Sequence, residues 1–454
     1  MLTLTAAEIR FIIKILRRFT VKKIFLLFLS GLILLFLTAC KPETASPEQA
    51  YQESSETLES TAASADVLGR DIVKWQEAFP LQAASNDKNH IEQSSPTGYN
   101  GSKPIQRWEW TPEIKVNFRG IAFSKDYKED RGHVYAWEDI FETARTSEKS
   151  PGACITCKTS DLELIFDEYG WDYASMKMYD FKESGHSGID CFSCHDPETR
   201  HLRVIQPAFI EAMAMRGKPV EEASEQDMKT YVCAQCHSEY YFEPGTTKVI
   251  FPWARGLSPE QMYSYYQEEP SGFTGDYTNP VSNTRLVKAQ HPDYETFQSG
   301  IHAAAGLSCA ECHMPETAVT AADGSSETIT QHWITSPLQT IDTSCLSCHK
   351  GKTEDWMLQR ARYIQDSVFD SLRRAGLAIE EAHLTIEKAA SDGLSNLAIS
   401  DAQAILREAQ WYWDFTASAN STGFHNSELA HSNLSMATDL AHKSTQKILR
   451  AYNI

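Results

Sequence analysis

The sequence predicts a mainly α-helical protein, with short helices and loops around five recurring cysteine motifs and long helices at the C-terminal end. Two observations support this fold class. Cys-x-x-Cys pairs recur between residues 154 and 350, in stretches rich in Gly, Pro and polar residues and poor in periodic runs. After residue 350, apolar residues recur at spacings of three and four, which is the period of an amphipathic helix.

Four of the five cysteine motifs are followed directly by histidine. Cys-x-x-Cys-His is the attachment sequence of c-type haem, in which both thiols form thioethers and the histidine becomes an axial iron ligand. A zinc half-site or a redox dithiol explains one such pair equally well, but zinc sites would use the motifs in twos. The sequence therefore predicts a multihaem cytochrome c with five covalently bound haems. The thioether cysteines are Cys154, Cys157, Cys191, Cys194, Cys233, Cys236, Cys309, Cys312, Cys345 and Cys348.

The residue after each motif is the expected proximal iron ligand. Four of these residues are histidines, and the first motif has Lys158 instead. A lysine binds iron only as the neutral amine, so Lys158 must lose its proton to serve. The alternatives are a surface lysine beside a haem ligated elsewhere, or a cysteine pair without haem. As a ligand, Lys158 marks the natural place for an open distal position. The four proximal histidines are His195, His237, His313 and His349.

The count of histidines predicts distal ligands for the other four haems. Electron-transfer haems are usually six-coordinate, so four of the eleven remaining histidines are needed. The best candidates are His133, His302, His332 and His425. Each of them, taken alone, is better explained as a surface or hydrogen-bonded histidine, and the need for four ligands is what favours a ligand role. That simpler interpretation is kept for His90, His186, His201, His383, His431 and His442.

The N-terminus predicts export. Residues 24–39 form an apolar run that is short for a bilayer span of about 20 residues and fits a signal-peptide core. The run ends in Leu-Thr-Ala-Cys40, which resembles a bacterial lipobox. We therefore expect a lipoprotein-type signal peptide over 1–39, lipidation of Cys40 and a flexible Ser/Thr/Glu-rich tether over 40–66. An uncleaved membrane anchor is the alternative. Both interpretations place the protein on the periplasmic side, attached to a membrane.

Charge excludes one class of partner. The formal net charge of −19 argues against binding to nucleic acid. It also means that a local positive field, rather than the whole surface, must attract any anionic substrate.

The C-terminal region is expected to hold three long helices, over 353–390, 400–419 and 426–452. Ser400 and Asp401 are candidates for capping the second helix. We therefore divide the folded chain into a haem-binding catalytic region, 67–350, and a long-helix region, 351–454, that packs on it. The simplest role of the long helices is a packing scaffold, and a dimer interface is the more specific one.

One lysine-ligated haem followed by four histidine-ligated ones resembles pentahaem ammonia-forming cytochrome c nitrite reductase, over roughly residues 70–454. Three further patches match that family: Glu239-Tyr240 after the third motif, Lys288-Ala-Gln290-His291-Pro, and Arg145 upstream of the first motif. The four distal candidates also fall at the family's ligand positions. Here the segment between Arg145 and Cys154 is shorter than is usual in the family.

The resemblance implies a reaction and a second cofactor. It implies that nitrite binds at the open face of the Lys158 haem, between Arg145, Tyr240 and His291. Six electrons, fed through the four bis-histidine haems, and eight protons would convert nitrite to ammonium. Arginine offers a fixed cation to the anion, and His and Tyr can donate protons. The resemblance also implies calcium on Glu239, Tyr240, Lys288 and Gln290, all oxygen donors of the type that calcium prefers.

Partners follow from the same resemblance. It implies a homodimer and a membrane-bound multihaem quinol dehydrogenase, or another cytochrome c, as the electron donor. Two other functions stay open: a pentahaem electron carrier without a substrate, and the same pocket acting mainly on sulfite or hydroxylamine. A pure carrier needs neither Lys158 nor the set Arg145, Tyr240 and His291.

Overall fold

The computed structural model describes residues 68–321 and 323–452. The predicted signal peptide, Cys40 and the tether lie outside these residues. Within the described ranges, no helix is both long and apolar enough to cross a membrane.

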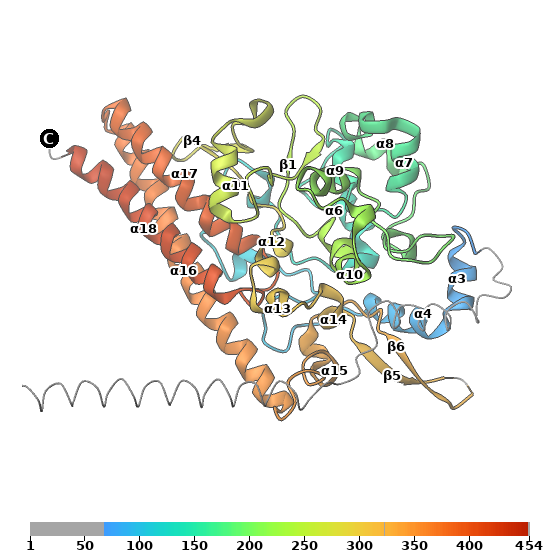
Figure 1. Cartoon of the computed structure of the whole chain (residues 1–454). Coiled ribbons are helices and arrows are strands. Elements are labelled where there is room, and N and C mark those ends of the chain that lie inside the picture. Colours follow the sequence, from blue (N-terminus) through green and yellow to red (C-terminus); the bar gives the residue numbers. More distant parts are fainter. Residues whose placement is uncertain (1–67, 322, 453–454) are drawn as a thin grey trace, which may run out of the picture. The chain divides into compact units, whose positions relative to one another are not determined.

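Short helices and small hairpins come first along the chain, and three long helices follow them (Figure 1). This order confirms the predicted mainly α fold with long C-terminal helices. Short 3-10 turns connect many of the early elements. The helices before the long ones are α3 (Ile72–Ala78), α4 (Pro80–Asn86), α5 (Ile114–Asn117), α6 (Ala136–Glu142), α7 (Leu162–Tyr169), α8 (Met178–Lys182), α9 (Pro207–Met215), α10 (Glu225–Ala234), α11 (Pro259–Tyr266), α12 (Asp293–Gln298), α13 (Ile301–Ala304), α14 (Cys309–His313) and α15 (Ile341–Ser344).

The three long helices lie side by side and pack on α5, α11 and β4 (Figure 1). They are α16 (Glu354–Ser391), α17 (Asn396–Ser418) and α18 (Ser427–Tyr452). The start predicted for the second helix was wrong by four residues. Gly393 has a φ of +77°, which turns the chain after α16. The hydroxyl of Ser395, and not Ser400, then accepts a hydrogen bond from the Ala398 amide and caps α17.

Close approach between elements requires a glycine inside α16. A Cβ atom at Gly376 would lie 2.8 Å from a carboxylate oxygen of Glu113 and 3.1 Å from the indole nitrogen of Trp413. The Gly376 carbonyl accepts a hydrogen bond from the Asn117 side chain at 3.0 Å. This contact fixes α5 and the loop after it against the long helices.

Three antiparallel hairpins were not predicted, and in two of them the strands, of two or three residues, are too short to show an alternating pattern. Two of them lie between the third and the fourth cysteine motif, in the region where short helices and loops were expected. They pair β1 (Tyr241–Phe242) with β2 (Val249–Ile250), β3 (Tyr277–Asn279) with β4 (Thr284–Leu286), and β5 (Glu316–Thr320) with β6 (Ser326–Thr330).

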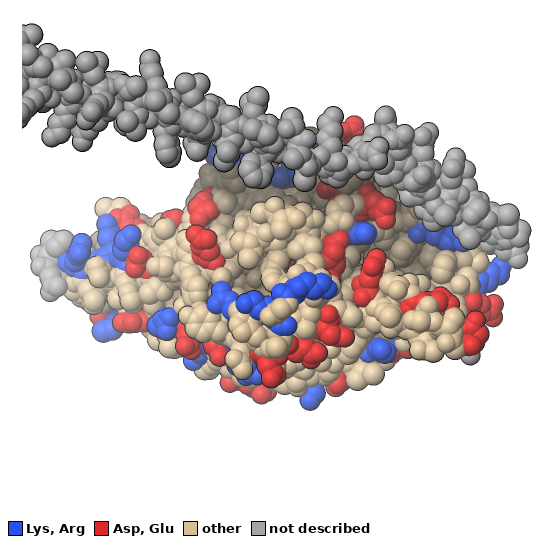
Figure 2. All heavy atoms as spheres, turned by 60° about the horizontal axis from the view of Figure 1, so that its bottom comes forward, with Lys and Arg blue, Asp and Glu red and all other residues tan. Residues whose placement is uncertain are grey.

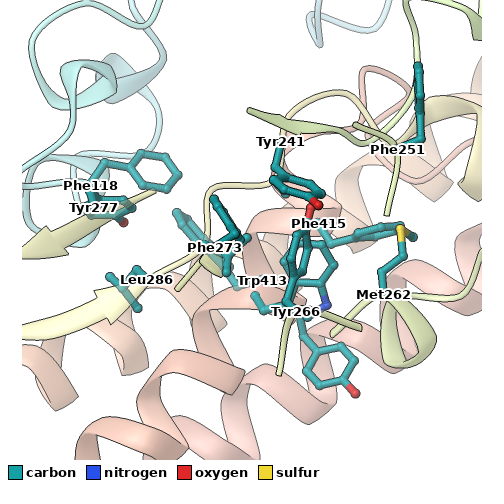
Figure 3. Packing of buried hydrophobic residues seen from close by; sticks show 14 of the residues in the cluster. Phe118, Tyr241, Phe251, Met262, Tyr266, Phe273, Tyr277, Leu286, Trp413 and Phe415 are labelled. Atoms are coloured by element: carbon teal, nitrogen blue, oxygen red, sulfur yellow. The ribbon is translucent and has the colours of Figure 1, made fainter. Parts of the chain in front are cut away.

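One apolar cluster joins the haem-motif region to the long helices. Figure 3 shows Phe415 and Trp413 of α17 beside Tyr241, Tyr266 and Phe273. Burying a large apolar side chain stabilises the fold by roughly 1.5–3 kcal/mol. The residues that flank the third motif are thus held on a rigid aromatic core.

A buried histidine links β3–β4 to α16 and α17. The two ring nitrogens of His383 lie 2.7 Å from the Ser282 hydroxyl and 2.8 Å from the Gln410 side-chain oxygen. Burial lowers the pKa of His383 to about 4, and the hydrogen bond with Gln410 opposes this only in part. His383 is therefore neutral in the folded protein at pH 7, and its hydrogen bonds account for it without a ligand role.

We expect His383 to make stability depend on pH. Its pKa is about 4 in the fold against 6.5 in the unfolded chain, so the unfolded chain binds more protons between these values. The free energy of unfolding should fall by roughly 3 kcal/mol as pH drops from 6.5 to 4. Denaturant titrations of the wild-type protein and His383→Gln across this range measure the effect. The variant should lose this part of the slope, whereas His431→Gln, at an exposed position of α18, should keep it. Equal slopes for wild type and His383→Gln would contradict the assignment.

Candidate functional site

The ten motif cysteines lie in short turns and helices, and all of them have free thiols. Thiols of different motifs come close to one another. Cys157 of the first motif contacts Cys236 of the third. Cys233 of the third motif contacts Cys309 of the fourth. The third motif therefore lies between the first and the fourth. Free thiols in this arrangement fit thioether attachment of neighbouring haems.

Each of the four proximal histidines faces one of the four predicted distal histidines. The ring centroids are 6.0 to 6.3 Å apart in all four pairs. Two metal–nitrogen bonds of about 2 Å each, plus the two ring radii, add up to about 6 Å. The spacing thus fits one iron between the rings of each pair. The pairs are His195 with His332, His237 with His133, His313 with His425, and His349 with His302.

Backbone carbonyls orient three of these rings. The Nδ1 atoms of His195, His313 and His332 lie 2.9 to 3.0 Å from the carbonyl oxygens of Arg200, Thr335 and Thr330. An Nδ1–H that donates to a carbonyl leaves Nε2 with the free lone pair that iron requires.

Burial favours the neutral form of two of the paired histidines. It lowers the pKa of His133 to about 3 and that of His313 to about 4, and the neighbouring histidines lower both further. Neutral imidazole is the form that binds a metal. His237 differs: burial lowers its pKa, but the hydrogen bond and the charge of Asp293 outweigh this and raise it. The donor set and its spacing fit haem c.

The first motif differs from the others. The four histidine pairs use all four predicted distal residues, so none of these faces Lys158. Lys158 follows the 3-10 turn Gly152–Ile155, and its amide donates to the Ile155 carbonyl at 2.8 Å. Among the described residues, the first motif is therefore the one that none of the four predicted distal histidines faces.

Arg145 and Tyr240 lie near the cysteines of the first motif, and His291 lies, like Lys158, near Asp130. Burial raises the pKa of Tyr240 well above its usual value, and the nearby Cys157 and Cys154 raise it further. The other two residues, Arg145 and His291, both lie near Asp130. The side chain of Asp130 is accessible to solvent, yet the surrounding protein desolvates it, which by itself would raise its pKa. The positive charges of Lys158, Arg145 and His291 outweigh this effect, so the pKa of Asp130 is lowered.

Two contacts fix Arg145 despite the short segment that follows it. Its Nε donates to the Thr143 hydroxyl at 3.3 Å, and its guanidinium lies 4.9 Å from the centre of the Phe123 ring. The Asp126 carboxylate accepts from the Thr143 hydroxyl and the Ala144 amide at 2.8 and 2.9 Å. The arginine is therefore anchored by its own loop.

Oxygen donors gather behind Tyr240. The carboxylate of Glu239 is fully buried and accepts hydrogen bonds from the Gln290 amide at 2.6 Å and the Tyr266 hydroxyl at 3.1 Å. The Gln290 side-chain amide lies 3.1 Å from the Lys288 carbonyl oxygen. Burial raises the pKa of Glu239 well above its usual value, although the hydrogen bond from the Gln290 amide opposes this. These donors fit calcium.

A buried ion pair braces this loop. The ammonium of Lys288 donates to Asp414 at 2.9 Å and to the Ser418 hydroxyl at 2.8 Å, both on α17. Asp414 also accepts from the Ala289 amide at 2.9 Å. The Lys288 side chain is thus held by α17, while its carbonyl accepts from the Gln290 side-chain amide.

Sequence reasoning missed Asp293. Its carboxylate lies 3.4 Å from Nδ1 of His291, 3.6 Å from Nδ1 of His425 and 3.8 Å from Nδ1 of His237. Donor atoms of His237, His291 and Asp293 lie close enough to hold a metal ion, but His237 already faces His133. The available sequence signal was only that Asp293 follows His291 by two residues.

Charge is unevenly distributed over the surface. Figure 2 shows a row of Lys and Arg side chains crossing a face that also carries many Asp and Glu side chains. Positive side chains thus gather locally on a chain whose net charge is negative.

The cytochrome c552 family model matches residues 71–453. Cytochrome c-552 of Bacteroides fragilis strain YCH46 is 34% identical over 413 residues, which cover 88% of this chain and 78% of that protein. The cytochrome c nitrite reductase subunit NrfA of Nitratidesulfovibrio vulgaris strain Hildenborough is 32% identical over 415 residues, covering 83% of this chain and 78% of that protein.

A solved structure agrees with the sequence relatives. The catalytic subunit NrfA of cytochrome c nitrite reductase from Desulfovibrio desulfuricans, described as having two calcium sites, superposes with a TM-score of 0.78 at 31% identity. The match covers 86% of this chain and 88% of that one. The family model, the relatives and the fold agree with the resemblance seen in the motifs, and the chain belongs to the cytochrome c552 family, whose members bind haem c.

Proposed function

We propose that the protein is an ammonia-forming nitrite reductase with five haems c, of which only the Lys158 haem binds substrate. The observation that carries this proposal is the pairing of all four proximal histidines with all four distal ones, which leaves only the first motif open. An electron carrier without a substrate would have no reason to leave one position open.

The residues around the first motif suit a small anion. When bound, the Lys158 haem supplies an open coordination position and electrons. Arg145 attracts nitrite and holds its oxygens with a fixed positive charge. His291 and Tyr240 donate hydrogen bonds and protons to the oxygens as the N–O bonds break. The balance is one nitrite, six electrons and eight protons to one ammonium and two waters.

The contacts between motifs support an order of electron flow. The third motif touches the first and the fourth through its cysteines, and Cys312 of the fourth lies near Cys345 of the fifth. Electrons from the second, fourth and fifth haems would reach the Lys158 haem through the third. A membrane-bound multihaem quinol dehydrogenase or another cytochrome c is the donor we propose.

The remaining assignments complete this proposal. We place the protein in the periplasm, tethered through lipidated Cys40 after removal of residues 1–39, with 40–66 as the tether. Residues 67–350 form the catalytic region, and 351–454 form the long-helix region through which two chains dimerise. Calcium on Glu239, Tyr240, Lys288 and Gln290 would neutralise the buried Glu239 carboxylate and hold the His291 loop against the third motif.

Replacing Lys158 tests the open site. In Lys158→His, all five haems should remain attached, because the first motif becomes an ordinary attachment sequence. Nitrite turnover should fall by about 10- to 100-fold, since the axial ligand of the reacting haem has changed. Ammonium formed from nitrite with reduced viologen measures turnover, and the pyridine haemochrome assay counts haem. Lys350→His, an exposed lysine directly after the fifth motif, is the control and should not alter turnover. Unchanged turnover in Lys158→His would remove Lys158 from the mechanism.

Removing the Glu239 charge tests the calcium site. We expect Glu239→Gln to lose bound calcium, because a cation of this charge depends on the carboxylate. Elemental analysis of the desalted protein gives the calcium content per chain. Glu243→Gln, which changes a partly exposed carboxylate bonded to Thr246 and Ser271, should retain calcium. If both variants hold as much calcium as the wild type, the ion is not at Glu239.

A further inference from the structure

Asp293 occupies a junction between three functional histidines. It is the first residue of α12, directly after His291-Pro292, and its side chain is buried. One oxygen accepts from the Asn420 amide at 2.9 Å and lies 3.6 Å from Nδ1 of His425. The other oxygen lies 3.4 Å from Nδ1 of His291 and 3.8 Å from Nδ1 of His237.

The number of donors matches the capacity of an ionised carboxylate. Two oxygens offer about four lone-pair positions, and the backbone amide of Asn420 and the Nδ1 atoms of three histidines lie around this one side chain. Nδ1 of His425 is buried and has no hydrogen-bond partner, so Asp293 is the acceptor within reach. The longer separations exceed hydrogen-bond length, and across them the carboxylate acts on the rings by its charge.

This environment differs from that of the other oriented ligands. His195, His313 and His332 direct Nδ1 at neutral backbone carbonyls, whereas His237 and His425 direct it at an anion. A carboxylate behind an imidazole makes the ring a stronger electron donor to the metal. Stronger donation stabilises ferric over ferrous iron and lowers the reduction potential of that haem.

His237 and His425 belong to different pairs. His237 faces His133 at the third motif, and His425 faces His313 at the fourth. These two motifs are neighbours, since Cys233 contacts Cys309. One carboxylate therefore stands behind one ligand of each of two adjacent haems.

We propose that Asp293 is a shared positioning residue that lowers the reduction potentials of the third- and fourth-motif haems together and orients His291 toward the substrate. With Nδ1 of His291 directed at Asp293, Nε2 is the nitrogen left to face nitrite. The first part rests on the haem assignment alone, and the second rests on the proposed function. The Asp293 carboxylate would thus act both on the haems that carry electrons and on His291, the proposed proton donor.

Redox titration of Asp293→Asn, followed by electron paramagnetic resonance without nitrite, tests the first part. The amide keeps the size of the side chain and removes its charge. Two of the five midpoint potentials should rise, and three should stay near their wild-type values. Asp293→Glu restores the charge and should return the two potentials toward wild type. The matched control is Asp161→Asn, because Asp161 lies 3.4 Å from Nδ1 of His186, which is not a predicted ligand. It should leave those two potentials unchanged.

Nitrite turnover tests the second part separately. Asp293→Asn should lower kcat by about 10- to 100-fold, as is typical when the partner behind a functional imidazole is lost, with all five haems attached. Unchanged potentials, or an equal shift of all five, would overturn the shared role. If haem is lost from Asp293→Asn, Asp293→Ser, which also removes the charge, takes its place in the titration: a rise at two haems alone supports the role, and potentials identical to wild type in all five overturn it. Shifted potentials in a protein that never reduces nitrite would uphold the inference and reject the proposed function.

Discussion

Two imidazole rings can share one iron only if the chain holds them opposite one another at one particular spacing. This protein has four such pairs of facing histidine rings, with about 6 Å between the ring centres in each pair. In every pair the two histidines come from separate segments of the chain, so the loops between motifs must return to fixed points. Glycines, short hairpins and single-turn helices make these returns. The fold of the first 280 or so described residues follows from that requirement more than from regular secondary structure.

The long helices meet a second need, which is to anchor loops that have little regular structure of their own. Lys288 reaches into α17 to pair with Asp414, and Asn420, just after α17, fixes one oxygen of Asp293. The aromatic core around Trp413 and Phe415 reaches the strand that follows Tyr240 (Figure 3). Site residues far apart in sequence are therefore fixed to one rigid element, as precise positioning of a reacting group demands.

The features of the fold and the site that depend on neighbouring residues could be predicted from the sequence. The features that depend on contacts between distant residues could not. Neighbouring residues determine the attachment motifs, the position of Lys158 and the long helices, so these features could be predicted from the sequence. The four distal histidines could be chosen by counting, but their partners could not, because pairing depends on loop paths. Asp293 was missed because an aspartate beside a proline looks like a turn residue. Two of the hairpins were missed because strands of two or three residues carry no period. The start of α17 was misplaced because Ser395 and Ser400 are equal candidates for a cap.

The measurement that tests the central claim most directly is nitrite consumption by the purified protein with reduced viologen, with ammonium and electrons counted. An open lysine-ligated haem fed by four closed ones predicts one ammonium and about six electrons per nitrite, because intermediates stay bound until reduction is complete. No turnover, together with five low-spin haems, would contradict the account: the first site would then be closed and the protein an electron carrier.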